Sequence, residues 1–327
     1  MDKVTVSPSP HLHSPASTDR IMLDVVIALV PALLVSFLFY GWSQLIVLLV
    51  SCAGCVGFEW LIARYLMKRP ELFSGTSALV TAILLAMNLP ATSPWWLVLT
   101  GSLVAIGIAK MSFGGLGQNI FNPAITARVF LLISFPVQMT NWTMPGKSFI
   151  AMDAISGATP LSVIKEGIKS GETISEVLAD KGMDMTMLLR DIGGSSGEIS
   201  ALALLIGFVY LLVRKVVKPW IPLSILVTIG VVAGIFHGIN PELYTGPNFN
   251  IMTGGVLLGA FFMATDYVTS PMSNWGGVIY GVGIGLIVMM IRYFGSYPEG
   301  MSFAILIMNC FVPLIDRAFH QKKFGRA

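Results

Sequence analysis

Residues 21–40, IMLDVVIALVPALLVSFLFY, form an apolar run long enough to cross a lipid bilayer. A helix needs about 20 predominantly apolar residues to span the hydrocarbon core. The run carries Asp24 and Pro31, and no small-residue cleavage site follows it. It therefore predicts a first transmembrane span and not a removable signal peptide.

The composition of the whole chain points to the same class of protein. Of 327 residues, 55% are hydrophobic and 11% are charged, whereas soluble domains average about 25% charged residues. The formal net charge of +3 is small and dispersed, which argues against a nucleic-acid partner. Three cysteines are too few for a disulfide framework. The Cys52-x-x-Cys55 pair lacks the second pair that an iron–sulfur cluster needs.

Further apolar runs predict an all-α integral membrane protein with about ten transmembrane helices. The long candidates are 21–40, 43–63, 94–112, 123–139, 199–213, 219–237, 275–294 and 301–319. Two more runs, 76–90 and 251–265, are short for a crossing and end in polar or helix-breaking residues, Asn88-Leu89-Pro90 and Thr265-Asp266. We expect these two helices to be interrupted or tilted.

The basic residues predict the orientation. With the N-terminus in the cytoplasm, most Lys and Arg residues of the short loops fall on the cytoplasmic side, as the positive-inside rule requires. These residues are Arg64, Lys68, Arg69, Lys110, Arg214, Lys215 and Lys218, with Arg317, Lys322, Lys323 and Arg326 in the tail. We expect a cytoplasmic segment 1–20, a first repeat 21–139, an outer loop 140–198, a second repeat 199–319 and a cytoplasmic tail 320–327.

A weak internal repeat supports this division. Thr92-Ser93-Pro94 follows the first short run, and Thr269-Ser270-Pro271 follows the second, 177 positions later. Five spans per half is an odd number, so the second half must enter the membrane in the opposite direction. Inverted repeats with interrupted helices usually place a binding site where the halves meet.

The outer loop contains the run Asp153-Ala154-Ile155-Ser156-Gly157-Ala158-Thr159. By itself the run is compatible with a turn in which Ser156 or Thr159 caps a following helix, and Thr159-Pro160 suits a cap followed by proline at the first helical position. The pattern Asp-x-x-Ser-Gly-Ala-Thr also resembles the site at which a flavin transferase joins FMN to a threonine through its phosphate.

Longer stretches resemble one membrane family throughout the chain. They are Ser9-Pro10-His11-Leu12-His13-Ser14, Ile21-Met22-Leu23-Asp24-Val25, residues 113–124 (FGGLGQNIFNPA), and Phe262-Met263-Ala264-Thr265-Asp266. The chain is similar to the NqrB/RnfD group, the membrane subunits of the sodium-pumping quinone reductase and of the Rnf ferredoxin–NAD complex. The short N-terminal segment favours the RnfD type within this group. Tyr267 departs from the proline that is common in the family.

The resemblance implies a component of a redox-driven ion translocase, with FMN esterified to Thr159 on the outer face. Gly157 and Ala158 then allow a transferase to approach, Ser156 belongs to its recognition motif, and Asp153 helps to orient the acceptor or a metal during attachment. A bacterial or archaeal inner membrane is the expected location. Other membrane and peripheral subunits must supply the NAD, ferredoxin and iron–sulfur sites, which this chain lacks.

Polar groups at membrane depth give two further candidate sites. In the quinone-reductase relative a comparable Asn-x-x-Asn helps to hold riboflavin, so Asn119 and Asn122 are the candidates here for a second, non-covalent flavin. Buried acids in spans are costly and often functional, which makes Asp24 and Asp266 candidates for a Na⁺ or H⁺ pathway.

Other polar residues have structural explanations. Glu59 is expected to pair with Arg64 one helical turn away, and the sequence leaves open whether Arg128 meets a carboxylate or a flavin phosphate. The run 193–198, GGSSGE, either lines the flavin site or only turns the chain into the next span.

The competing hypothesis is a solute channel on a five-plus-five inverted repeat, similar to urea and ammonium transporters. It leaves the Thr159 loop without a purpose. A purely structural scaffold explains the buried acids least well.

Overall fold

The computed structural model describes residues 17–143, 156–157, 159–180 and 194–319. The regular secondary structure of this part of the chain is helical except for one antiparallel pair of two-residue strands, β1 (Trp142–Thr143) and β2 (Ser156–Gly157). The helices of the first half are α1 Thr18–Tyr40, α2 Trp42–Leu61, α3 Gly75–Asn88, α4 Trp95–Leu103, α5 Pro123–Ser134 and α6 Pro136–Thr140. Those that follow are α7 Pro160–Ser170, α8 Ile174–Asp180, α9 Ala201–Val213, α10 Trp220–Ile239, α11 Pro247–Met252, α12 Val256–Leu258, α13 Asn274–Phe294 and α14 Met301–Ala318.

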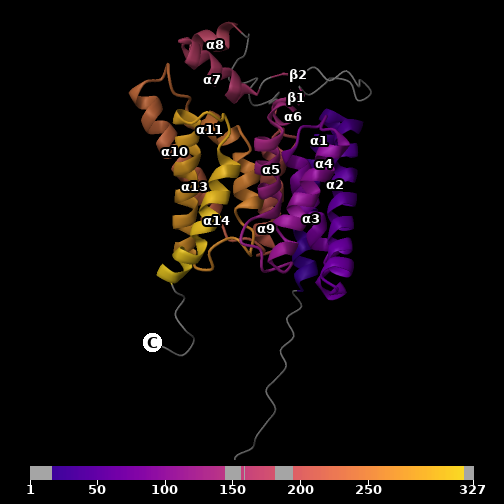
Figure 1. Ribbon diagram of the computed structural model, residues 1–327. Helices are drawn as coiled ribbons and strands as arrows, with labels where there is room; N and C mark the ends of the chain where they lie inside the picture. Colours follow the sequence, from indigo (N-terminus) through magenta and orange to yellow (C-terminus); the bar gives the residue numbers. More distant parts are fainter. Residues whose placement is uncertain (1–16, 144–155, 158, 181–193, 320–327) are drawn as a thin grey trace, which may run out of the picture.

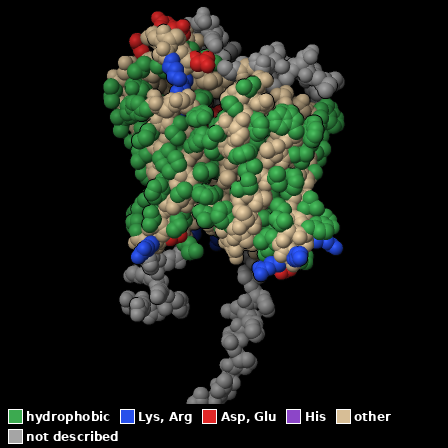
Figure 2. Space-filling model, in the orientation of Figure 1, with side chains coloured by type: hydrophobic (Ala, Val, Ile, Leu, Met, Phe, Trp, Pro, Cys, Tyr) green, Lys and Arg blue, Asp and Glu red, His purple; other side chains and the backbone are tan. Residues whose placement is uncertain are grey.

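The helix bundle has the dimensions and surface of a membrane protein. Six helices of the described residues are long and apolar enough to cross a bilayer, and three shorter apolar helices, α3, α5 and α9, accompany them. In Figure 1 the long helices stand side by side, with the start of α1 and the end of α14 at one end of the bundle and α6 to α8 at the other. Hydrophobic side chains cover the middle of the face seen in Figure 2, and charged side chains gather at the two ends. The prediction of an all-α, multi-pass membrane protein is confirmed.

The repeat that Thr92-Ser93-Pro94 and Thr269-Ser270-Pro271 indicate extends over both halves of the bundle. The starts of α2 and α10, of α4 and α13, and of α5 and α14 are separated by 178, 179 and 178 positions. The two halves run in opposite directions, because α5 leads to α6 at one end of the bundle, whereas α14 ends at the other (Figure 1). The inverted arrangement follows from the odd number of spans in each half.

The two short apolar runs form interrupted helices, as their lengths predict. α3 has 14 residues and ends inside the bundle at Asn88. α11 and α12 are separated by Gly254 and Gly255, whose φ angles of +70° and +67° end one helix and start the next. A single π-helical turn, Gly259–Met263, then extends α12.

Helix ends inside a bilayer leave carbonyl groups that no water can satisfy. At the end of α3, the carbonyl oxygen of Met87 accepts a hydrogen bond from the Gly197 amide (2.9 Å), and that of Ala86 accepts one from the Ser196 hydroxyl (3.1 Å). At the end of the π-helical turn, the carbonyl oxygen of Met263 accepts a hydrogen bond from the Asn122 side chain (3.1 Å). Each interrupted helix is thus completed by residues far away in the sequence.

Candidate functional site

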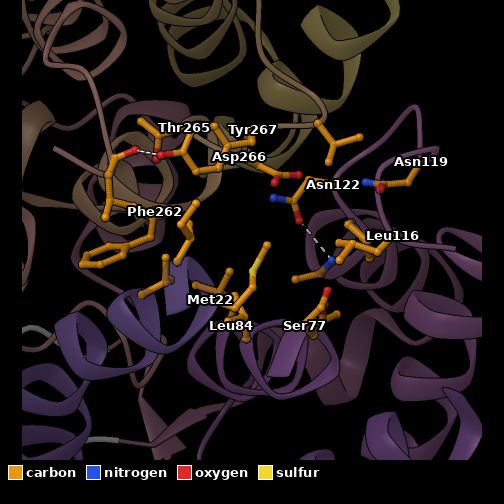
Figure 3. Close-up of a pocket in the computed structure, with 18 of the residues that line it drawn as sticks. Met22, Ser77, Leu84, Leu116, Asn119, Asn122, Phe262, Thr265, Asp266 and Tyr267 are labelled. Carbon is orange, nitrogen blue, oxygen red and sulfur yellow. Dashed lines mark hydrogen bonds between the residues drawn. The ribbon is translucent and has the colours of Figure 1, made fainter. Parts of the chain in front are cut away.

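A cavity lies between the two repeats and collects several of the predicted site residues. Its lining includes Asn119, Asn122 and Asp266, together with side chains from α1, α3 and α9. Figure 3 shows Asp266 and Asn122 on one side of this cavity and Met22, Ser77 and Leu84 on the other. The structure therefore brings Asn119, Asn122 and Asp266 together, although they are up to 147 positions apart.

The amide group of Asn122 has a structural role. Its Oδ1 accepts hydrogen bonds from the backbone amides of Ala124 (3.1 Å) and Ile125 (3.3 Å), which caps α5, and its Nδ2 donates to Met263. Asn119 Nδ2 donates to the carbonyl oxygen of Phe121 at 3.1 Å, a bond within its own loop. Asn122 thus joins the end of the π-helical turn in the second repeat to the start of α5 in the first.

The cavity is small for a second flavin. Its volume is about 70 Å³, whereas an apolar cavity of roughly 150 Å³ accommodates a single benzene ring. Asn122 Oδ1 already accepts two hydrogen bonds and its Nδ2 donates one in this arrangement. The second flavin at Asn119 and Asn122 stays a prediction.

The two acids predicted for an ion pathway lie in different surroundings. Asp266 faces the cavity between the repeats, and its Oδ2 accepts a hydrogen bond from the Thr269 hydroxyl at 3.2 Å. Asp24 instead joins α1 to α9: it accepts a hydrogen bond from the Tyr210 hydroxyl (2.9 Å) and forms an ion pair with Arg214 (3.2 Å). The structure does not place the two acids in one pathway, and their roles in ion transport stay predictions.

The expected pairing of Glu59 with Arg64 is wrong. Glu59 forms a fully buried ion pair with Lys110 at 2.9 Å, and the Lys110 ammonium also donates to the Ser77 hydroxyl at 3.0 Å. The Arg64 guanidinium lies over the ring of Trp60, 5.6 Å from its centre. Lys110 lines the cavity between the repeats, so it is part of the core and does not mark the membrane surface.

Thr159 caps the helix that follows the outer loop, as the Thr-Pro sequence predicts. Its Oγ1 accepts a hydrogen bond from the Ser162 amide (3.3 Å) and donates one to the Ser162 hydroxyl (3.0 Å). The residue is 4% exposed. Gly157 and Ser156 pair with β1, whereas Asp153 and Ala158 lie outside the described residues.

A second cavity of about 230 Å³ opens along α7. One face of the helix lines it through Leu161, Ile164, Lys165, Ile168 and Lys169, and aromatic side chains form the opposite wall: Tyr244, Phe249, Tyr293 and Phe294. The apolar spacing of α7 predicts a helix that packs against a partner, but the aromatic partner comes from segments about 80 and 130 residues later and was not predictable from the loop alone.

Lys165 fastens α7 to the end of α13. Its ammonium group donates hydrogen bonds to the carbonyl oxygens of Ile291 (3.2 Å), Arg292 (3.0 Å) and Tyr297 (2.7 Å). The carbonyl groups at the C-terminus of a helix carry partial negative charge and favour a cation. The loop helix is thereby fixed on the membrane bundle.

A cluster of buried charges, missed by the sequence analysis, lies at the same end of the bundle. Arg128 forms an ion pair with Glu299 at 2.5 Å, so its partner is a carboxylate. Glu198 and Arg292 are also buried. Within the run 193–198, the described residues 194–198 form a buried turn against the end of α3. These charged groups come from distant segments of the sequence and meet only in the folded structure.

Comparison with known proteins assigns the chain to a family. The family model described as NQR2, RnfD, RnfE matches residues 5–325. The D subunit of the Na(+)-translocating ferredoxin:NAD(+) oxidoreductase complex of Acetobacterium woodii is 43% identical, over 98% of this chain and 95% of that protein. The D subunit of the ion-translocating oxidoreductase complex of Stutzerimonas stutzeri is 40% identical, over 95% of this chain and 93% of that protein. Its counterpart in Halorhodospira halophila is 38% identical, over 97% and 94%. With a match over nearly its whole length and three such relatives, the chain belongs to the NQR2, RnfD, RnfE family.

Proposed function

We propose that this chain is the RnfD-type membrane component of an ion-translocating ferredoxin:NAD oxidoreductase, and that it carries FMN esterified to Thr159. It passes electrons within the complex and contributes to the movement of Na⁺ or H⁺. The names and full-length similarity of its relatives support the complex. They favour this function over that of a solute channel, because the relatives are named as components of oxidoreductases.

The single observation that supports the flavin site is the position of the Thr159 hydroxyl at the start of an 11-residue helix. A helix N-terminus presents free amide groups and a partial positive charge, which stabilise a phosphate. The Ser162 amide, which now donates to Thr159 Oγ1, is the donor that already contacts the atom to be esterified. The residues present fit a phosphate-linked cofactor at this atom.

The cavity along α7 is the larger of the two cavities described and lies beside the proposed attachment site. It begins at Leu161, two residues after Thr159, and extends to Lys169, a distance of about 12 Å at 1.5 Å per helical residue. The aromatic side chains of Tyr244 and Tyr293 supply stacking surfaces. FMN supplies one- or two-electron transfer when bound, and the chain's own residues fix its position and shield it.

We also propose an orientation in a bacterial or archaeal cytoplasmic membrane. α1 begins and α14 ends at one end of the bundle, and α7 lies at the other (Figure 1). Lys68, Arg69, Lys215 and Lys218 lie in the loops next to the end where α1 begins, which supports a cytoplasmic position for that end. Thr159 then lies at the outer end of the bundle.

The test is in-gel flavin fluorescence of the denatured protein after co-expression with a flavin transferase. Thr159→Ala is compared with Thr173→Ala. Thr173 is a matched control, because its hydroxyl also accepts a hydrogen bond from the amide three residues on, that of Glu176 (3.3 Å), in the same segment of the chain. Fluorescence is expected in the wild type and in Thr173→Ala, and is expected to be lost only in Thr159→Ala.

Two results would contradict the proposal. A dark wild-type band, with the transferase active on a control substrate, removes the covalent flavin and leaves the solute-channel hypothesis. Fluorescence that persists in Thr159→Ala places the flavin on another residue.

A further inference from the structure

Four charged side chains are buried together where the two repeats and the outer segment meet. They are Arg128 of α5, Arg292 of α13, Glu198 of the turn before α9, and Glu299 before α14. Arg128 and Arg292 are each 5% exposed and Glu198 is 6% exposed, and 14% of the Glu299 side chain is exposed. Charged groups that are buried to this extent destabilise the fold unless each has a partner.

The two arginines are held in place by other groups. Arg128 donates to the Asn88 side chain (2.7 Å) and to Glu299 (2.5 Å). Arg292 donates to the carbonyl oxygens of Asn250 (2.5 Å) and Thr253 (2.6 Å), which are left free where α11 ends. Guanidinium groups stay protonated in proteins, so these bonds fix two positive charges in the cluster.

Glu198 differs from the other three groups. Among the described residues it accepts a hydrogen bond from the neutral Ser195 hydroxyl (2.5 Å) but forms no ion pair within 4 Å. Arg128 is engaged by the competing carboxylate of Glu299. Burial and the nearby Glu299 raise the pKa of Glu198 to about 7, although Arg128 and Arg292 act in the opposite direction.

The backbone of Gly255 lies close to the Glu198 side chain. A Cβ atom on Gly255 would lie 3.1 Å from Glu198 Oε1 and 3.5 Å from Arg128 Nη1. The two charged groups therefore lie close to the break between α11 and α12. On the other side of the turn, the Tyr40 hydroxyl of α1 donates to the carbonyl oxygen of Gly194 at 3.1 Å. Tyr40 is thus a further titratable group on the elements packed around Glu198.

We propose that this cluster is a proton-binding site in which Glu198 takes up and releases one proton, while Arg128, Arg292 and Glu299 remain charged. Two carboxylates share two fixed arginines, so the cluster is neutral when Glu198 is ionised and carries one positive charge when Glu198 is protonated. The O–H bond forms on the Glu198 carboxylate, and the proton comes from or returns to solvent at the end of the bundle, where 14% of the Glu299 side chain is exposed.

Arg292 connects this site to the loop helix. It lines the cavity along α7, and its carbonyl oxygen accepts a hydrogen bond from Lys165 at 3.0 Å. Negative charge placed in that cavity stabilises the positively charged, protonated form of the cluster. The use of this coupling in ion translocation rests on the proposed function, whereas proton binding by Glu198 does not.

The experiment is infrared difference spectroscopy of the full chain in nanodiscs, without flavin, as the pH is varied. The C=O stretch of a protonated carboxyl group is followed in the wild type, in Glu198→Gln and in Glu299→Gln. Glutamine reproduces the shape of the protonated acid and its hydrogen bond from Ser195. A band with a midpoint near pH 7 is expected in the wild type and is expected to be absent in Glu198→Gln. In Glu299→Gln the band should persist with a lower midpoint, because a neighbouring negative charge has been removed.

Thermal unfolding gives a second readout on the same samples. Because the pKa of Glu198 is higher in the folded chain than the usual 4.5 of the unfolded chain, the folded state binds the proton more tightly. The contribution of Glu198 to stability is therefore greatest at low pH and declines as the pH rises through about 7. The Tm of the wild type relative to that of Glu198→Gln should therefore fall as the pH rises through about 7.

The proposal is wrong if the wild type and Glu198→Gln give the same carboxyl bands at every pH. It is also wrong if the midpoint of the wild-type band lies near the usual 4.5 of a glutamate. A band that is abolished by Glu299→Gln and not by Glu198→Gln would contradict it too. None of these results depends on covalent flavin, which the in-gel experiment tests separately.

Discussion

Replacement of Lys110 by methionine would leave the Glu59 carboxylate buried without its ion-pair partner. In the wild type the ammonium group lies 3.0 and 2.9 Å from the two carboxylate oxygens and 3.0 Å from the Ser77 hydroxyl. Only 2% of the Lys110 side chain and none of the Glu59 side chain is exposed. In Lys110→Met, only the hydrogen bond from the Ser74 amide to Glu59 (3.2 Å) remains.

The magnitude follows from the burial of both partners. Removing one partner of a buried ion pair costs about 3–5 kcal/mol, because the other charge is left without compensation. The double variant Glu59→Gln/Lys110→Met has no buried charge, and its glutamine still accepts from the Ser74 amide. Its loss is about 1–2 kcal/mol, the net value of one or two neutral hydrogen bonds. The double variant should therefore be more stable than either single variant.

The assay is reversible unfolding of the purified protein in mixed micelles, analysed as a double-mutant cycle. Arg64→Met is the control. It removes a cation from the same segment, where Arg64 contacts only the Trp60 ring among the groups described, and should cost about 0.5 kcal/mol or less. If the double variant loses the sum of the two single losses, the pair has no coupling and the reasoning is refuted.

Three further changes have defined outcomes. Lys165→Met should speed limited proteolysis of α7 from the outer side, because three carbonyl contacts at the end of α13 are lost; Lys169→Met, a neighbouring loss of charge on the same helix, should not. Gly255→Ala should lower the Tm more than Gly171→Ala. Both glycines have positive φ (+67° and +88°), but only at Gly255 would the new Cβ meet other side chains. Asn122→Ala should cost about 1–3 kcal/mol in unfolding, because it removes the cap of α5 and leaves the Met263 carbonyl group unpaired; equal stability of Asn122→Ala and wild type would contradict the role given to this residue.

Much of the fold was predictable from local sequence. Apolar length located most of the spans, since a crossing helix needs a fixed number of apolar residues. The run 123–139, expected as one span, is instead divided into α5 and α6, and the run 199–213 gives a helix of only 13 residues. The two shorter runs predicted interrupted helices, and Thr159-Pro160 predicted the start of α7. These features depend on residues that are close in the sequence, so no knowledge of the tertiary structure was needed.

The site contacts were less predictable, because they join distant segments. The Glu59–Arg64 pairing was chosen for its separation of about one turn, whereas the observed partner, Lys110, is 51 positions away. The resemblance to the quinone-reductase relative made Asn122 a candidate for binding a flavin. That role stays a prediction, but the structure also gives the Asn122 side chain a partner that the sequence did not indicate, a backbone carbonyl 141 positions away. A free polar group in a span predicts that a partner exists but does not identify it.

The interrupted helices explain why so many polar contacts cross between the repeats. Each break exposes carbonyl groups in an environment without water, and the neighbouring residues of the same helix cannot reach them. Residues 196 and 197 complete α3, Asn122 completes the turn ending at Met263, and Arg292 completes α11. Of these groups Arg292 alone carries a charge, and it lies beside both the α7 cavity and Glu299. The structural need to satisfy α11 therefore places a permanent positive charge in the cluster that contains Glu198. Burial and Glu299 favour a proton on Glu198, whereas Arg292 and Arg128 oppose it, and this balance is the physical condition for a proton site in the ion-translocating complex.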